Sequence, residues 1–416
     1  MNDQDSLPVL VVGAGVSGIT AALEAAETGA SVVLVERQPY VGGRVAGFYH
    51  YFPKMCPPSC GLEINVQRLE RNPRVRVLTE TRVSAAEQVD GGWRVTLERA
   101  PAYVTEACTG CGECSKVCPV SVVDEFNHGM SSSPAIRLSH PQAWPQRFVI
   151  ERAACADGCE ACVQSCAYDA IHLDATVTTE ELQVGSVVLA TGWQPYPLEK
   201  LSELGGGVLP DVISNVQMER LASPSGPTAG QILCPSTGQP PRRVAFVQCA
   251  GSRDVNHLPY CSGICCLASL KHAQYVKDQH PDTEVSIFYI DRRTPGRNED
   301  VLTRIGDMDG VRLVKGKVGK VEAGDGGLVL TVEDVEAGRK LHEQADLVVL
   351  ATGMVPTGNG ESPFGIARDE DGFALDDFDR GLVVAGVARR PTDVAAAVRD
   401  ATGSAARALA AAERGA

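Results

Sequence analysis

Eight of the fifteen cysteines stand in two short runs with the spacing of metal ligands. The first run places four thiols within residues 108–118 and ends in Cys-Pro, and the second places four within residues 155–166. Spacing of the first kind is typical of paired 4Fe-4S clusters, in which three close thiolates hold one cluster and the fourth reaches the other. This rule predicts one cluster on Cys108, Cys111, Cys114 and Cys166. It predicts a second cluster on Cys155, Cys159, Cys162 and Cys118.

Two other interpretations of these runs are weaker. Structural zinc sites take cysteine pairs separated by about a dozen or more residues, whereas each run here packs four thiols into that length. The second run departs from the iron–sulfur pattern by one additional residue in its first gap and by Ala167 in place of proline. Disulfides are disfavoured because the chain is predicted to be cytoplasmic.

The N-terminus and the composition are the basis of that localisation. Residues 1–5 are acidic, and the apolar stretch after them stops at Gly13, unlike a secretory signal. No run of 18 apolar residues is present, so we predict no membrane-spanning helix. The net charge of −14 disfavours binding of nucleic acid and of anionic lipid. We therefore expect any contact with a membrane to be made through a partner.

A predicted buried strand over residues 8–12 leads into a glycine-rich turn and a helix over residues 19–28. The turn carries three spaced glycines, Gly13, Gly15 and Gly18. In such a turn one glycine admits a pyrophosphate, another lets the helix pack on the strand, and helix N–H groups face the phosphates. The next strand, over residues 31–35, ends in Glu36, where a carboxylate can accept from ribose hydroxyls. Together these features predict a dinucleotide site.

Later segments favour FAD over NAD as the dinucleotide. A motif typical of flavoproteins with two dinucleotide-binding domains follows the acid, formed by Gly42, Gly43 and Arg44. Two predicted strands end in Ala-Thr-Gly and resemble the crossovers into and out of the second domain of such proteins, with candidate contacts at Thr191, Gly192, Thr352 and Gly353. A strand over residues 381–385, followed by Gly386, resembles the segment that closes the flavin site, although Val387 replaces the usual acid.

A third group of cysteines lies where a second dinucleotide-binding domain would have its phosphate loop. Predicted elements over residues 243–247, 264–277 and 284–289 repeat the order strand, helix, strand, but the first connection lacks the glycine pattern. This region instead carries Cys249, Cys261, Cys265 and Cys266. Thiolates and helix N–H groups both favour a cluster at this pole, so we predict a third 4Fe-4S cluster, with buried structural cysteines as the alternative. The missing loop predicts that this domain does not bind NAD(P)H.

The remaining cysteines are harder to interpret. Cys56 and Cys60 lie about where disulfide-reductase flavoproteins keep redox thiols, and they are either a redox pair or inert packing thiols, because reactivity depends on the local charge. Cys234 is interpreted as a lone thiol. The eight histidines show no metal-like spacing and are interpreted as surface or satisfied residues.

A family resemblance follows from these residues. The sequence Gln-Cys-Ala-Gly-Ser-Arg-Asp over residues 248–254, with the cysteines of residues 260–266, resembles the signature of the A subunit of heterodisulfide reductase and its relatives. The cluster-binding insert before the first Ala-Thr-Gly segment is similar to theirs too, and the resemblance covers nearly the whole chain. Within this family, residues 51–65 and the short length resemble the A subunit of the quinone-interacting membrane-bound oxidoreductase (Qmo) complex.

The resemblance implies an FAD and iron–sulfur electron-transfer subunit, inactive alone, that relays electrons between the quinone pool and adenylylsulfate reductase in sulfur metabolism. Flavin-based electron bifurcation or confurcation is an added hypothesis. The implied partners are a second flavin or iron–sulfur subunit together with a membrane-integral subunit, which would attach the chain peripherally to the inner membrane. The alternative is a self-contained NAD(P)H-dependent oxidoreductase similar to the small subunit of glutamate synthase, and the missing second glycine loop argues against it.

These motifs predict an α/β fold with two Rossmann-like domains of the thioredoxin reductase type and an inserted ferredoxin-like domain. The expected order is residues 1–100 for the first part of the FAD-binding domain, 101–178 for the insert, 179–239 for the return and a Pro/Gly-rich connector, 240–344 for the second Rossmann-like domain, and 345–416 for the last part of the FAD-binding domain. The alanine-rich stretch over residues 393–414 predicts a closing helix.

Overall fold

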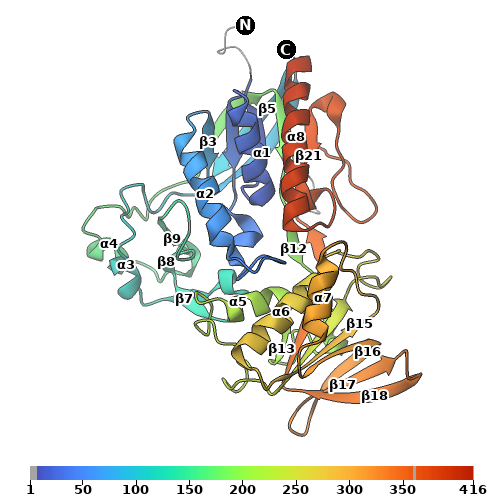
Figure 1. The fold of residues 1–416 in the computed structure, drawn as a ribbon. Helices are drawn as coiled ribbons and strands as arrows, with labels where there is room; N and C mark the ends of the chain where they lie inside the picture. Colours follow the sequence, from blue (N-terminus) through green and yellow to red (C-terminus); the bar gives the residue numbers. More distant parts are fainter. Residues whose placement is uncertain (1–6, 359–361, 416) are drawn as a thin grey trace.

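The computed structural model describes residues 7–358 and 362–415, so the acidic stretch of residues 1–5 lies outside the described residues. The chain forms a first domain at the top of Figure 1, a second domain below it, and an insert that projects to one side between them. The C-terminal helix returns to the first domain and packs beside its first helix. The predicted α/β fold class is confirmed by this architecture.

The first domain is built on a five-stranded parallel sheet. In spatial order its strands are β21 (Leu382–Val384), β11 (Ser186–Leu189), β1 (Val9–Val12), β2 (Val32–Val35) and β3 (Val75–Leu78). The inner strands are runs of valine and leucine, as expected for strands that are buried on both faces. The predicted strands over residues 8–12, 31–35 and 381–385 are confirmed, each slightly shortened.

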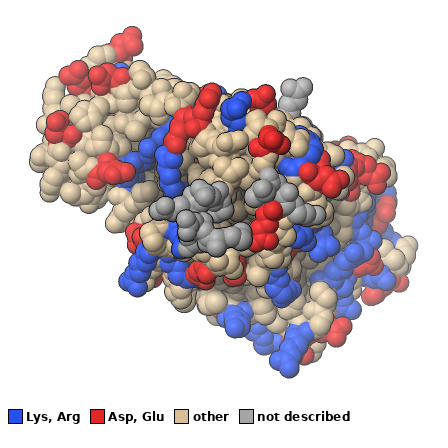
Figure 2. Space-filling model, turned by 90° about the horizontal axis from the view of Figure 1, so that it is seen from above, with Lys and Arg blue, Asp and Glu red and all other residues tan. Residues whose placement is uncertain are grey.

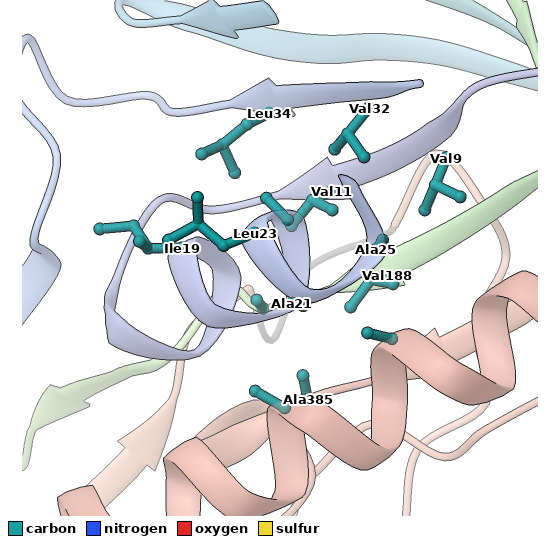
Figure 3. Close-up of a cluster of buried hydrophobic side chains, with 14 of the residues drawn as sticks. Val9, Val11, Ile19, Ala21, Leu23, Ala25, Val32, Leu34, Val188 and Ala385 are labelled. Carbon is teal, nitrogen blue, oxygen red and sulfur yellow. The ribbon is translucent and has the colours of Figure 1, made fainter. Parts of the chain in front are cut away.

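Helices cover one face of this sheet. They are α1 (Val16–Glu27), α2 (Pro58–Arg71) and α8 (Val394–Gly415). Side chains of α1 interleave with those of the sheet, as Leu23 does with Val11 in Figure 3, and alanines of α1 and α8 let the two helices approach closely. The alanine-rich helix predicted at the C-terminus is confirmed as α8.

A small antiparallel sheet covers the opposite face. Its strands, in spatial order, are β10 (Thr178–Val184), β5 (Gly92–Arg99) and β4 (Thr81–Val89). Trp93, Val95 and Leu97 of β5 pack against Leu10 and Val33 of the parallel sheet. The Trp93 indole also donates to the backbone oxygen of residue 380 at 2.7 Å, so its one polar group is satisfied inside this core.

The second domain has a seven-stranded sheet. In order, its strands are β13 (Val212–Ser214), β19 (Leu347–Thr352), β14 (Arg243–Ala250), β15 (Glu284–Tyr289), β16 (Val311–Gly324), β17 (Gly327–Asp334) and β18 (Arg339–Ala345). The first five are parallel, and the last two form an antiparallel meander with β16. Packed against the sheet are α5 (Asn215–Ala222), α6 (Cys265–Gln279) and α7 (Asn298–Gly306). The predicted helix over residues 264–277 is confirmed as α6.

Two short antiparallel strands connect the domains. β12 (Trp193–Pro195) follows the first Ala-Thr-Gly segment, β20 (Met354–Pro356) follows the second, and the two pair with each other. In residues 7–358 and 362–415, no helix combines the length and the apolar character needed to cross a membrane.

The insert consists of two hairpins and two short helices. These are β6 (Ser121–Val123) with β7 (Ser132–Pro134), β8 (Ile136–Leu138) with β9 (Phe148–Ile150), α3 (Glu113–Lys116) and α4 (Ala161–Ser165). Its core contains few apolar residues besides the cysteines. A core of this size contributes little stability by itself, so bound clusters would supply much of the folding free energy.

Candidate cofactor sites

A cavity of about 1080 Å³ opens at the carboxyl ends of β1, β2 and β11. Ligands of parallel α/β sheets bind at this edge. Eight of the predicted cofactor contacts line the cavity, namely Gly13, Gly15, Glu36, Gly42, Gly43, Arg44, Thr191 and Gly192. Ordinary small-molecule sites enclose about 300–1,000 Å³, so this volume suits an extended ligand of two nucleotides.

The glycine turn after β1 has the geometry that a pyrophosphate needs. Gly13 adopts a φ of +100°, which disfavours other residues, and Gly15 is the N-cap of α1. A Cβ added to Gly43 would lie 2.8 Å from Gly15 Cα, so the second glycine motif packs directly on the first. The turn therefore leaves backbone N–H groups at the start of α1 open to an anionic ligand.

Glu36 directly follows β2 and lines this cavity. Its carboxylate accepts from the Ala14 N–H at 2.7 Å and from the Gln38 N–H at 2.8 Å, which joins it to the glycine turn. Burial raises the pKa of Glu36, and these backbone donors oppose that shift. The side chain is thus fixed where ribose hydroxyls of a dinucleotide would lie.

Arg44 reaches across the cavity to the strand that leaves the first domain. Its Nε donates to the Trp193 carbonyl at 3.1 Å, and its guanidinium lies 5.9 Å from the centre of the Trp193 ring. Burial lowers the pKa of Arg44. A partly buried cation in this position complements a phosphate or an electron-rich ring.

Four predicted contacts do not line the cavity. They are Gly18, Thr352, Gly353 and Gly386. A Cβ on Gly18 would lie 1.7 Å from the Gly13 oxygen, so Gly18 has the packing role that the motif predicts. The Thr352 hydroxyl donates to Asn215 at 3.0 Å, and the Gly386 N–H donates to Asp400 at 2.7 Å.

Residues next to two of these contacts do reach the cavity. Met354, just after Gly353, lines it, and so does Val387, which follows Gly386 in place of the expected acid. The sequence thus located the closing segments correctly, but it did not determine which residue of each faces the cavity. No pattern in the sequence distinguishes the residue that lines the cavity from the glycine before it.

A buried ionisable group beside the cavity was missed by the sequence interpretation. Glu219 of α5 contacts Lys271 Nζ and accepts from His272 Nε2 at 2.6 Å and from the Tyr49 N–H at 3.0 Å. Lys271 also donates to the His50 carbonyl at 2.8 Å. Burial alone would raise the pKa of Glu219, but the Lys271 ammonium lowers it to about 2. In the sequence, the adjacent Lys271 and His272 within a predicted helix were the only sign of this buried group.

The protonation states of this group follow from its contacts. Burial lowers the pKa of His272, so its ring is neutral, and its Nε2–H donates to the Glu219 carboxylate. His272 Nδ1 is then a buried acceptor that has no hydrogen-bond partner within the described part of the chain. His50, Glu219, Lys271 and His272 all border the cavity. Three of the histidines interpreted as surface or satisfied residues, His50, His128 and His272, therefore line the cavity.

The insert brings its two cysteine runs into one core. Cys108, Cys114, Cys118, Cys162 and Cys166 all pack in it. A small void is lined by Cys118, Cys155, Cys159 and Cys162, the four residues predicted to share a cluster. In the other set, burial and the neighbouring thiol of Cys108 raise the pKa of Cys114 to about 11, and Cys111 adds to the shift.

The third cysteine set meets where β14 ends and α6 begins. Cys249 has a left-handed φ of +56°, and Cys265 is buried. Burial raises the pKa of Cys265, and Cys249, Cys266 and Cys261 raise it further. The Arg293 N–H points at Cys266 Sγ from 3.4 Å.

The three cysteine sets consist of thiol donors only. Within the described ranges, no three His, Cys, Asp or Glu side chains converge closely enough to bind one metal ion. A structural zinc draws its thiolates to about 2.3 Å from one point, whereas a cubane spreads four thiolates over four irons. The all-cysteine donor sets fit 4Fe-4S clusters, in which each iron takes one thiolate.

Cys56 and Cys60 lie at the start of α2 and are both exposed. Nearby Tyr51, Phe52 and Pro53 line the cavity, but neither cysteine does. Cys234 is buried, with its thiol 3.5 Å from the Asp346 carbonyl, and burial raises its pKa to about 11. Cys234 is thus placed as a lone structural thiol, while the role of the other two remains a prediction.

Family comparisons assign chemistry to two segments of the chain. Residues 8–49 match the FAD dependent oxidoreductase family, and residues 101–124 match the 4Fe-4S binding domain. The first segment contains the glycine turn and Glu36, and the second contains the first cysteine run. These matches support FAD and 4Fe-4S binding, while the number of clusters stays a prediction.

Two named reductase subunits are similar to this chain over nearly its whole length. The chain is 36% identical over 416 residues to the A subunit of the H(2):CoB-CoM heterodisulfide,ferredoxin reductase of Methanothermobacter marburgensis, covering 96% of this chain and 63% of that protein. It is 37% identical over 410 residues to the A subunit of the Ferredoxin/F(420)H(2)-dependent CoB-CoM heterodisulfide reductase of Methanosarcina acetivorans, covering 94% and 52%. The chain thus resembles the A subunits of heterodisulfide reductases over nearly its whole length. It spans less than two thirds of the length of these relatives.

Solved structures support the fold. Thioredoxin reductase of T. acidophilum superposes with a TM-score of 0.53 at 14% identity, covering 97% of this chain and 98% of that one. Bacillithiol disulfide reductase of Bacillus cereus gives a TM-score of 0.53 at 13% identity, covering 98% and 99%. These likenesses show a thioredoxin-reductase-like fold.

Proposed function

We propose that the chain relays electrons within a Qmo-like complex, between the quinone pool and adenylylsulfate reductase. FAD, when bound, exchanges electrons in pairs or singly, and each 4Fe-4S cluster exchanges one. The observation that carries the proposal is that cysteine sets adjoin the dinucleotide cavity from two different sides.

The hairpin β8–β9 forms the first of these boundaries. Ile136 and Ile150 line the void of the second cysteine set, while their neighbours Arg137 and Val149 line the cavity. Successive side chains of a strand point to opposite faces, so a single two-stranded layer separates the two sites. This arrangement supports direct exchange between the insert and the cavity.

The helix α6 forms the second boundary. Ile264 precedes Cys265 and lines the cavity, and Leu267 one turn later does the same. Cys265 itself lies 3.9 Å from the Thr352 carbonyl, behind that wall. The third cysteine set is thus separated from the cavity by the first turn of one helix.

The buried group of Glu219, Lys271 and His272 transfers the protons that this function requires. Lys271 and the Glu219 carboxylate lie together at the cavity wall, and His272 Nδ1 offers an additional acceptor. A carboxylate, an ammonium group and a neutral imidazole in contact can hold and pass a proton as a ligand changes its charge. We assign to them the protons that accompany electron transfer at the cavity.

Partners are inferred from charge and from the segment around Cys56 and Cys60, which resembles the A subunit of Qmo. The insert carries nine Asp and Glu against four Lys and Arg. Figure 2 shows red patches over the lobe at the left, the side on which Figure 1 places the insert. We propose that a basic face of a redox partner docks there, with charge-steered and salt-sensitive kinetics. A second flavin or iron–sulfur subunit, together with a membrane-integral subunit, would complete the complex.

Co-purification with cofactor analysis tests this function. The tagged chain, isolated anaerobically with mild detergent, should carry one FAD and about 12 iron atoms, three cubanes of four. It should retain a membrane-integral partner, and the isolated complex should reduce or oxidise a quinone analogue. A free monomer that turns over a small molecule without quinone would overturn the relay proposal.

A further inference from the structure

The hairpin β8–β9 of the insert contributes an arginine side chain to the lining of the cavity in the first domain. Arg137 lines the cavity from β8, directly opposite Val149 of β9 in the register of the hairpin. Its Nη2 pairs with Glu151 at 3.2 Å, while Nη1 is buried and has no partner among the described residues. A guanidinium that is held on one side and unpartnered on the other is prepared for a ligand.

Contacts of the insert show which end of the cavity this hairpin covers. Arg147, just before the hairpin's second strand, pairs with Glu80 at 2.7 Å, and both side chains are largely buried. His140, just after β8, packs edge-on against Tyr40, with ring centres 4.8 Å apart. The Val41 N–H donates to the Trp144 carbonyl at 3.0 Å.

These anchors all lie at the end of the cavity that Glu36 marks. Tyr40 and Val41 belong to the segment that follows Glu36, and Glu80 precedes Thr81, which lines the cavity at the start of β4. A carboxylate at the end of the second strand of such a domain accepts from the adenosine ribose. The hairpin therefore covers the adenosine end, opposite the end bordered by His50 and Lys271.

We propose that Arg137 of the insert is a binding residue for the adenosine half of the dinucleotide. Its guanidinium donates to acceptor atoms of the adenosine moiety, while Val149 beside it offers an apolar surface. Glu151 fixes the guanidinium and thereby orients the donor. The inference rests on the proposed binding of FAD, and it makes retention of FAD depend on the cluster-binding insert.

The test compares FAD with FMN, which lacks the adenosine half. Flavin-free protein with its clusters intact is titrated with each flavin, and binding is followed by flavin fluorescence for wild type, Arg137→Ala and Arg137→Lys. Arg152→Ala is the matched control, because Arg152 also belongs to the insert but does not line the cavity. Iron per chain and the thermal midpoint report the integrity of the insert.

We expect Arg137→Ala to weaken FAD binding at least tenfold and FMN binding less than twofold, with iron content unchanged. Arg137→Lys should lie between wild type and Arg137→Ala, and Arg152→Ala should match wild type. Equal weakening of FAD and FMN, or FAD binding within twofold of wild type, would overturn the inference and leave the proposed function intact. Wild-type protein that binds neither flavin would instead overturn the proposed function.

Discussion

The first and second domains share an order of elements but differ in the connection after one strand. In the first domain β1 ends at Val12 and α1 begins at Val16, so residues 13–15 make the whole turn. In the second domain β14 ends at Ala250 and α6 begins at Cys265, so residues 251–264 intervene. The same edge of a parallel sheet thus presents a tight backbone turn in one domain and thiols in the other.

This difference indicates how the same fold can provide sites for two kinds of redox group, a dinucleotide in the first domain and the predicted 4Fe-4S cluster in the second. A glycine turn exposes N–H groups to phosphates because nothing but backbone lies at the helix N-terminus. In the second domain a longer connection brings thiols to the same position, from Cys249 at the end of β14, Cys261 in the loop, and Cys265 and Cys266 at the start of α6, and the positive end of the helix favours thiolates there. Both domains keep five parallel strands because function depends on the loop and not on the strands.

The largest effect is expected from Gly18→Ala in the first domain. The added Cβ would meet the Gly13 oxygen at 1.7 Å, and neither backbone segment can move without disturbing the sheet. We expect a loss of about 3 kcal/mol or more in the free energy of unfolding and no retained FAD. Chemical denaturation and flavin absorbance measure both.

Gly403→Ala is the control for that change. Gly403 lies within α8, and a Cβ added there meets no heavy atom within 4 Å. This variant should be more stable than wild type by about 0.5–1 kcal/mol, because alanine favours the helix. If Gly18→Ala retained stoichiometric FAD, the tight turn would not be required for binding.

Removal of a thiol from the second domain is expected to have the next largest effect. Cys265→Ala should lose about four iron atoms per chain and keep FAD, since each cube has its own ligands. Cys234→Ala is the matched control, because Cys234 is similarly buried in the same domain but belongs to no set. Iron analysis that finds no loss in Cys265→Ala would remove the third cluster.

A smaller, pH-dependent effect on the free energy of unfolding is expected from a change at Glu219, at the junction between the domains. Glu219→Gln should lower the free energy of unfolding at pH 7 by about 3 kcal/mol, because it leaves the buried Lys271 without its counter-charge. The exposed Glu63→Gln should change it by less than about 0.5 kcal/mol.

The pH dependence of this difference has a defined sign. Since the pKa of Glu219 falls from 4.5 to about 2 on folding, its stabilisation is complete above pH 4.5 and is lost as the pH falls toward 2. The difference between wild type and Glu219→Gln, measured by denaturation at several pH values, should shrink over that range. A difference that stays constant down to pH 2 would contradict the assignment.

The smallest expected effect concerns pyridine nucleotides. Neither NADH nor NADPH should reduce the flavin rapidly in the isolated chain, because the loop over residues 251–264 lacks the glycine turn that binds a pyrophosphate. Dithionite serves as the positive control. Saturable reduction by either nucleotide in stopped-flow absorbance would favour the NAD(P)H-dependent alternative and show that the two domains are more alike than their loops suggest.

The sequence by itself determined the features that depend on local spacing. Cysteine intervals indicated cluster ligands, and the order of strand, glycine turn, helix and acid indicated a dinucleotide site, because each pattern is imposed by residues close together in the chain. The family, the fold class and the ends of most core strands followed from the same patterns.

Only the tertiary structure showed which residues far apart in the sequence line the same part of the cavity. It joined Tyr49 and His50 to Glu219 and Lys271, and it placed Arg137 at one face of a hairpin whose other face meets the insert's cysteines. Such contacts depend on how separate elements pack, and no periodicity within one segment encodes them. The same reason explains why Val387 and Met354, and not the glycines beside them, line the cavity.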